Sequence, residues 1–147
     1  MTTATNIRRF VAKLEKLRAS TSDSMETIVS HLKGNAASTG VSVYGNLVDE
    51  ANRLDAYDYV LRGFGVGDHR SRSDMPDGYT VHDAPFEVLM AVAEDILYSL
   101  RNDMVQQARR PVVRTSHSMN PEYFYTLGDL LHKLETAISD DKFDARH

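Results

Sequence analysis

Apolar side chains recur every three or four residues in five stretches of the chain, which is the spacing of an amphipathic helix. The polar run STSDS separates the first two stretches, and Asp23 with Glu26 resembles a capping box that opens the second. The final segment, 139–147, is expected to fray. The pattern therefore predicts helices over 6–19, 23–34, 43–61, 85–110 and 121–138.

The chain is expected to form one all-α domain spanning residues 1–147. No segment alternates apolar and polar residues for long enough to predict a sheet. With 41% hydrophobic and 26% charged residues, the composition is that of a soluble globular protein. The prediction is a single-domain bundle of about five helices, with a long central helix at 85–110 and one long Gly/Pro-rich connector.

The helix predicted at 85–110 is apolar around most of its circumference. Its polar positions Glu87, Glu94, Tyr98 and Arg101 fall on one narrow line. One domain of this size is not expected to cover so much apolar surface, so we predict a homo-oligomer, most simply a two-fold dimer. The predicted oligomer interface comprises Leu89, Val92, Ile96, Leu97 and Leu100.

The connector RGFGVGDHRSRSDMPDGYTVHDAP contains closely spaced glycines. A phosphate cradle needs a helix N-terminus directly after such glycines, and here the run DHRSRSDMPDG intervenes. We predict a flexible loop at 63–82 in which Arg70, Arg72 and Tyr79 contact a partner. A lid whose two arginines grip a carboxylate or phosphate is the alternative.

The first 20 residues are basic, although the net charge of the whole chain is −4. Such an arm favours an anionic partner or the protein's own acidic surface. Arg9, Lys13 and Lys16 are the predicted partner-binding residues of this helix. Nucleic acid is not the favoured partner, because the chain as a whole is acidic, and a nucleic-acid binder is the third candidate function.

Two acidic segments, LVDEANRLDAYD and AVAEDILYSL, resemble the paired acidic helices of the all-α nucleotide pyrophosphohydrolases. The resemblance implies that Asp55, Asp58, Glu94 and Asp95 hold magnesium against a triphosphate. That family spaces each acidic pair by three residues, whereas Glu94 and Asp95 are adjacent. A solvated acidic helix face explains the same residues. A magnesium-dependent nucleotide phosphohydrolase is therefore the alternative function.

His82 and Asp83 resemble the metal-binding doublet of the HD-domain phosphohydrolases, which implies further ligands from other helices. The alternative is that Asp83 caps the helix at 85–110 while His82 is exposed. The chain has no cysteine, which excludes disulfides and thiolate metal sites within it.

No apolar run reaches the roughly 20 residues needed to cross a bilayer, and MTTATNIRRF lacks the apolar core of a signal peptide. We therefore expect a small cytoplasmic helical protein that binds another macromolecule. We expect it to need no cofactor and to bind no membrane. A protein is the expected partner, and a regulator, an inhibitor or an assembly factor is the expected role.

Overall fold

The computed structural model describes residues 4–34, 41–66, 74–109 and 121–146. Over these ranges the chain forms helices and no strand, which confirms the all-α class. The helices are α1 (Thr5–Gly34), α2 (Val41–Gly63), α3 (Phe86–Arg109) and α4 (Pro121–Ala145). Among the described residues, no helix combines the length and apolar character that crossing a bilayer requires.

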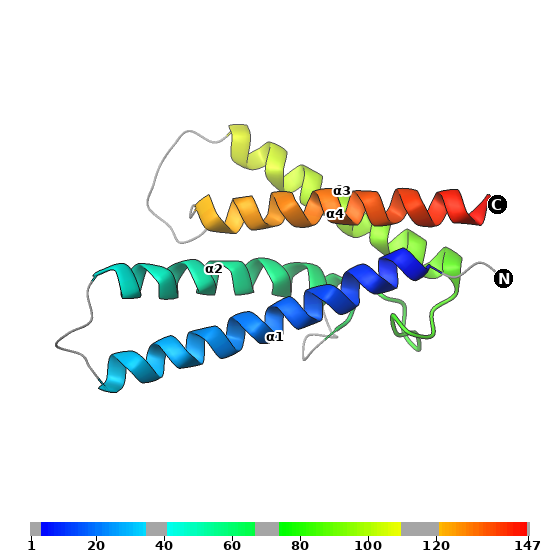
Figure 1. The fold of residues 1–147 in the computed structure, drawn as a ribbon. Helices are drawn as coiled ribbons and strands as arrows, with labels where there is room; N and C mark the ends of the chain where they lie inside the picture. The colour runs from blue at the N-terminus through cyan, green and yellow to red at the C-terminus, as the bar shows by residue number, and fades with distance from the viewer. Residues whose placement is uncertain (1–3, 35–40, 67–73, 110–120, 147) are drawn as a thin grey trace.

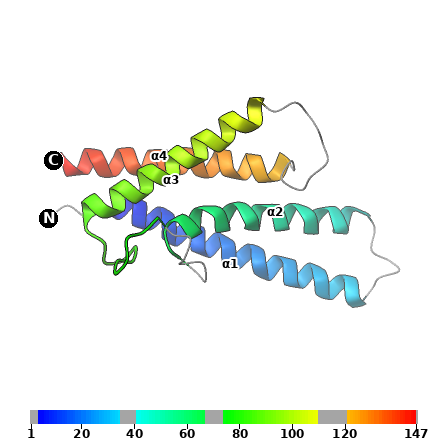
Figure 2. The same cartoon turned by 180° about the vertical axis from the view of Figure 1, so that it is seen from behind.

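Helices α1 and α2 form an antiparallel hairpin, and α4 lies alongside both (Figure 1). Seen from behind, α3 runs obliquely across α4 and its last turns diverge from α2 (Figure 2). Helix α4 packs against each of the other three helices, whereas α3 packs mainly against α4. The central helix of the bundle is therefore α4, whereas the apolar pattern predicted that α3 would be central.

Helix α1 is one continuous helix of 30 residues, not the two that were predicted. The polar run STSDS lies within it, where Ser, Thr and Asp lower helix propensity by an amount that tertiary contacts outweigh. Thr21 is buried in this run, and Arg18 just before it forms an ion pair with Asp58 of α2. Packing against α2 thus supports the helix through a segment that its local sequence marks as a break.

Helix α4 continues to Ala145, so most of the segment expected to fray is helical. Asp141 in this segment is fully buried. Its carboxylate accepts hydrogen bonds from the backbone nitrogens of Asn6 (2.9 Å) and Ile7 (2.8 Å), and from Nδ2 of Asn6 (2.9 Å). Asp141 therefore satisfies amide groups that the first turn of α1 leaves without helical partners, and its charge suits that helix end.

The residues predicted as an oligomer interface lie in the core of the chain itself. Leu89, Val92, Ile96, Leu97 and Leu100 are each at most 6% exposed. Helix α4 covers part of this surface, and the connector adds Phe64, Val81 and Ala84 to the same core cluster. This apolar surface of α3 is therefore part of the protein core, because α4 and apolar residues of the connector pack in the same cluster. Self-association itself stays a prediction, but these residues no longer support it.

Gly63 and Gly65, at the start of the connector, shape the end of α2. Gly65 has a left-handed φ of 72°, its N–H donates to the carbonyl of Arg62 (3.0 Å), and the N–H of Val66 donates to Leu61 (3.0 Å). This pair of hydrogen bonds is the Schellman C-cap. At Gly63, an added Cβ would lie 2.8 Å from Cδ1 of Ile96. The two glycines thus close α2 and let its end approach α3.

The far end of the connector is attached to α1 by Arg8. Its Nε donates to the carbonyl of Val81 (2.8 Å) and its Nη2 to that of Ala84 (2.6 Å). Asp83 closes a turn instead of capping α3, because its Oδ1 accepts hydrogen bonds from the N–H (2.6 Å) and hydroxyl (3.0 Å) of Thr80. These bonds lower the pKa of the Asp83 carboxyl below its usual value.

Candidate binding groove between the terminal helices

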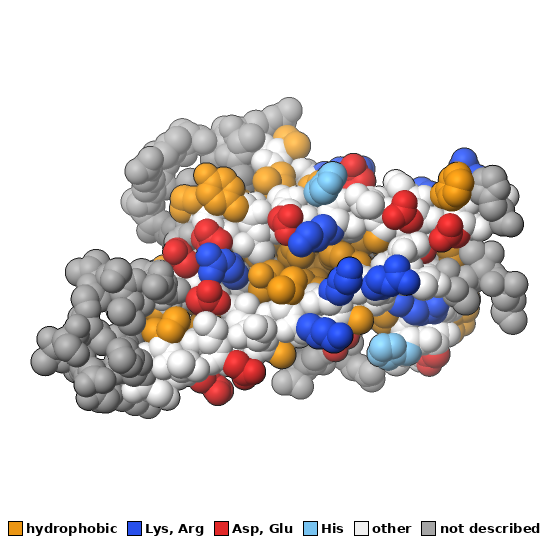
Figure 3. All heavy atoms as spheres, in the orientation of Figure 1, with side chains coloured by type: hydrophobic (Ala, Val, Ile, Leu, Met, Phe, Trp, Pro, Cys, Tyr) orange, Lys and Arg blue, Asp and Glu red, His pale blue; other side chains and the backbone are white. Residues whose placement is uncertain are grey.

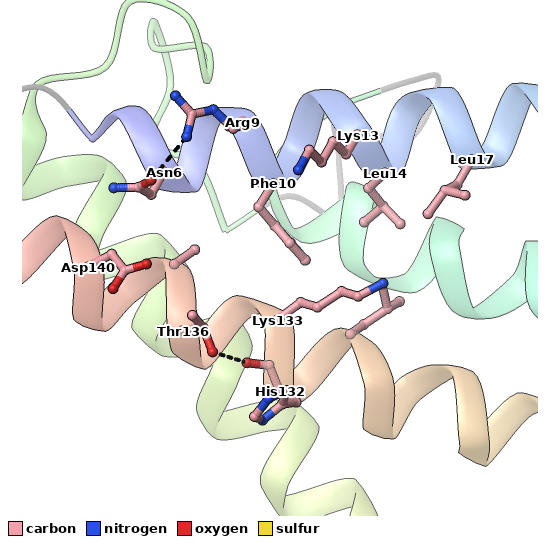
Figure 4. Close-up of a pocket in the computed structure, with 12 residues that line it drawn as sticks. Asn6, Arg9, Phe10, Lys13, Leu14, Leu17, His132, Lys133, Thr136 and Asp140 are labelled. Atoms are coloured by element: carbon pink, nitrogen blue, oxygen red, sulfur yellow. Dashed lines mark hydrogen bonds between the residues drawn. The ribbon is translucent and has the colours of Figure 1, made fainter.

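A groove of about 480 Å³ lies between α1 and α4 (Figure 4). The two helices run antiparallel there, so the first half of α1 faces the second half of α4 (Figure 1). Its apolar lining residues are Phe10, Leu14, Leu17, Leu130 and Ala137. Its polar lining residues are Asn6, Arg9, Lys13, His132, Lys133, Thr136 and Asp140.

The floor of the groove is built mainly from one row of α1. Phe10, Leu14 and Leu17 occupy positions i, i+4 and i+7, which lie on one face of a helix. Phe10 and Leu14 are buried, and Phe10 packs against Phe64 with ring centroids 6.4 Å apart. Leu17 is 40% exposed at the end of the same row. The row thus begins in the protein core and emerges as accessible apolar surface.

The rim of the groove is cationic on both sides. Arg9 and Lys13 come from α1 and Lys133 from α4. The Lys133 side chain extends from α4 into the space between the helices, Lys13 lies along α1, and Arg9 is turned away from α4 (Figure 4). Basic side chains surround the apolar centre of this face (Figure 3). Asp140 is the acidic residue among the lining side chains. A protein with a net charge of −4 therefore gathers positive charge around one apolar surface.

The three rim cations differ in how they are already engaged. Lys133 forms an ion pair with Asp129 one turn before it (2.9 Å), and Arg9 donates a long hydrogen bond to Asn6 (3.4 Å). Within the described part of the chain, Lys13 has no ion pair. The Lys133 pair is exposed and i,i+4, so it holds the ammonium only weakly. All three cations remain accessible to an anionic ligand.

The structure brings together only some of the predicted partner-binding residues. Arg9 and Lys13 line the groove, and Lys16 is exposed on α1 beyond it. Tyr79 is 43% exposed on the connector, where its N–H donates to Pro76. Arg70 and Arg72 lie outside the described residues, so their role stays a prediction.

The α4 wall of the groove was not predicted from the sequence. His132, Lys133, Thr136 and Asp140 line this wall, and Thr136 Oγ1 donates to the carbonyl of His132 within the helix. Only the antiparallel pairing of the first and last helices places these residues opposite Arg9 and Lys13. A basic row on α1 was the one local indication of the site.

The carboxylates proposed for magnesium are not assembled into one site. Asp58 pairs with Arg18, and Glu94 pairs with Lys142 of α4 at 2.7 Å. Burial and the nearby charge of Asp58 raise the pKa of Asp55. Across the described residues, no group of three or more His, Asp or Glu side chains could hold a metal ion. His82 is exposed, so the HD-like doublet likewise has no third ligand in this part of the chain.

A side-chain hydrogen bond links α2 to α3. The Tyr59 hydroxyl donates to Oδ2 of Asp103 (2.7 Å). Burial first, and then this bond, raise the pKa of Tyr59 above its ordinary value. A phenol with a raised pKa keeps its proton at neutral pH and makes a poor general base. The contact therefore holds two diverging helices together rather than forming a reactive site.

The groove combines an apolar floor with cationic side chains on its two walls. An apolar floor binds apolar side chains by removing them from water, and a cationic rim selects anionic partners. Comparisons with protein-family models, curated proteins and solved structures each found no match for the chain.

Proposed function

We propose that the protein acts by binding another protein through the groove between α1 and α4. The observation that carries the proposal is the apolar row ending in exposed Leu17, flanked by Arg9, Lys13 and Lys133. A concave site of about 480 Å³ that combines an apolar lining with a few polar side chains is the usual form of a binding site. The role is that of a regulator, an inhibitor or an assembly factor.

Two further features support this function over enzymatic hydrolysis. Among the described residues that line the groove, Asp140 is the one carboxylate, and two of the four carboxylates proposed for magnesium already have cationic partners. The chain has no cysteine, which suits the cytoplasmic setting proposed for it. Self-association belongs to the same proposal, because a second copy of the chain is itself a protein partner.

Substitution of Leu17 tests the proposed function. Leu17→Glu places a charge on the groove floor at an already exposed position. Val29→Glu is the matched control, because Val29 is 36% exposed on the same helix and does not line the groove. Tagged wild-type protein and both variants are recovered from native host cells, and co-purifying proteins are quantified by mass spectrometry. We expect Leu17→Glu alone to lose a specific partner; equal recovery by both variants would contradict the proposal.

A further inference from the structure

We infer that the groove binds an amphipathic α-helix of the partner protein that carries acidic residues beside its apolar stripe. This inference rests on the proposed function and specifies the partner's chemistry. Three properties of the groove lead to it: the spacing of its apolar residues, its length, and the placement of its charges.

The apolar residues of the two walls have helical spacing on both sides. Phe10, Leu14 and Leu17 advance along α1, while Leu130 and Ala137 lie two turns apart on the antiparallel α4. Leu17 is 40% exposed and the other four are at most 8% exposed, so a ligand helix would lie over a largely buried floor and contact Leu17 between the two walls. The matching ligand offers apolar anchors at i, i+3 or i+4, and i+7, as in other helix-in-groove complexes.

The groove has the length of a short helical segment. Its α1 lining extends from Asn6 to Leu17, which corresponds to about 17 Å at the helical rise per residue. About three turns of a bound helix span that distance. An extended peptide would place its side chains on alternate sides and could direct only every second one onto this floor. A helix therefore matches the row better than a strand.

The positive charges lie where the flanks of such a helix would be. Arg9, Lys13 and Lys16 occupy i, i+4 and i+7 along α1, next to the apolar row, and Lys133 lies on the other wall. In paired helices, residues flanking the apolar seam form the ion pairs that determine partner choice. Carboxylates on both edges of the ligand would thus meet cations, and a basic helix would be rejected.

Other anionic occupants match the groove less well. A nucleic acid needs a run of cations along its phosphates and gains little from an aliphatic floor. A fatty acid would use one carboxylate and leave cations on the opposite rim without a partner. These ligands are nevertheless anionic, so the experiment includes them as competitors.

The test uses a synthetic fluorescent peptide of about 16 residues, with leucines at helical spacing, glutamates on both flanks and alanines elsewhere. One control peptide has each glutamate replaced by glutamine, and a second has the same composition with the leucine stripe scrambled. Binding to the full-length protein is measured by fluorescence anisotropy. We expect saturable binding of the acidic amphipathic peptide and at least about tenfold weaker binding of either control peptide.

Charge-reversed variants identify the surface involved. Lys13→Glu and Lys133→Glu should each weaken peptide binding by about tenfold. Arg101→Glu is the matched control, because Arg101, like Lys133, is an exposed cation in one ion pair and lies outside the groove. It should leave the affinity unchanged. Circular dichroism of each variant establishes that it remains helical.

The two proposals fail in distinguishable ways. If the acidic peptide does not bind, or binds no better than its glutamine version, the inference is wrong; Leu17→Glu can still lose its native partner, and the proposed function then stands. If an oligonucleotide or dodecanoate binds more tightly than the peptide and is weakened by Lys13→Glu, the groove has a different occupant and the inference is also overturned.

Discussion

The Oδ2 atom of Asp141 lies 2.8 Å from the backbone nitrogen of Ile7, although 134 positions separate the two residues. This bond joins the last turns of α4 to the first turn of α1, and Asp141 is fully buried where it does so. Because the groove is formed by these two helices, the same contact fixes one end of the groove. The binding surface therefore depends on a buried carboxylate that belongs to the core rather than to the lining.

We predict that Asp141→Asn lowers the free energy of unfolding by about 1–3 kcal/mol, because an amide nitrogen would replace one acceptor beside buried N–H donors. Chemical denaturation followed by circular dichroism measures the change. Asp140→Asn is the control, since Asp140 is exposed, and should alter stability by less than about 0.5 kcal/mol. Equal effects of the two substitutions would contradict the buried contact.

The continuity of α1 can be tested at Asp23. If Asp23 lies inside a helix, Asp23→Ala should stabilise the protein by up to about 0.7 kcal/mol, because alanine has the higher helix propensity. If Asp23 instead were the N-cap of a second helix, the same substitution would destabilise the protein by about 1 kcal/mol. The sign of the change in a denaturation experiment distinguishes the two structures.

Local periodicity was sufficient to predict the all-α class and the positions of α2 and α3. It failed where distant residues decide the structure. The run STSDS is compatible with a helix only because α2 packs beside it, and residues 139–145 are helical while Asp141 caps a helix at the other end of the chain. The local sequence of each segment does not show the distant helix that it packs against.

The site was half predictable for the same reason. Arg9 and Lys13 belong to a basic row that the sequence displays, whereas Lys133 becomes part of the site only when α4 lies against α1. At α3 the sequence-based prediction was wrong, because its apolar circumference suggested an interface with a second subunit. Phe64 and Val81 of the connector belong to the core, although the Gly/Pro-rich composition of the connector predicts an exposed loop.

Arg8 should be more important for stability than its neighbour Arg9. Arg8→Ala removes two charge-assisted hydrogen bonds to the carbonyls of Val81 and Ala84, and should destabilise the protein by about 1.5–3 kcal/mol. It should also speed hydrogen exchange just before α3. Arg9→Ala should change stability by less than about 0.5 kcal/mol, because Arg9 is exposed on the rim. Unchanged exchange in Arg8→Ala would show that the attachment is not needed.

The Tyr59–Asp103 contact predicts a specific response to alkaline pH. Burial and this bond raise the pKa of Tyr59 in the folded state. The contribution of the protonated Tyr59 hydroxyl to stability is therefore fully present below the unfolded-state pKa of about 10. It is lost as the pH rises from there through the higher folded-state pKa. Wild-type stability should therefore fall more steeply above pH 10 than that of Tyr59→Phe.

At neutral pH, Tyr59→Phe should itself lower the free energy of unfolding by about 0.5–1.5 kcal/mol, the usual net value of one hydrogen bond. Tyr125→Phe, at a tyrosine that is 74% exposed, should leave it within about 0.5 kcal/mol of wild type. Parallel stability curves for wild type and Tyr59→Phe between pH 9 and pH 11 would contradict the assigned role of this contact.

Site-specific photo-crosslinking in native host cells tests the groove as the binding surface most directly. A photoreactive amino acid is placed at Leu17, on the groove floor, or at Tyr98, which is 74% exposed on α3 and outside the groove. Irradiation followed by mass spectrometry then reports which position touches a partner. The binding account predicts a defined protein adduct at position 17 and none at position 98. An adduct at position 98 with none at position 17 would contradict it.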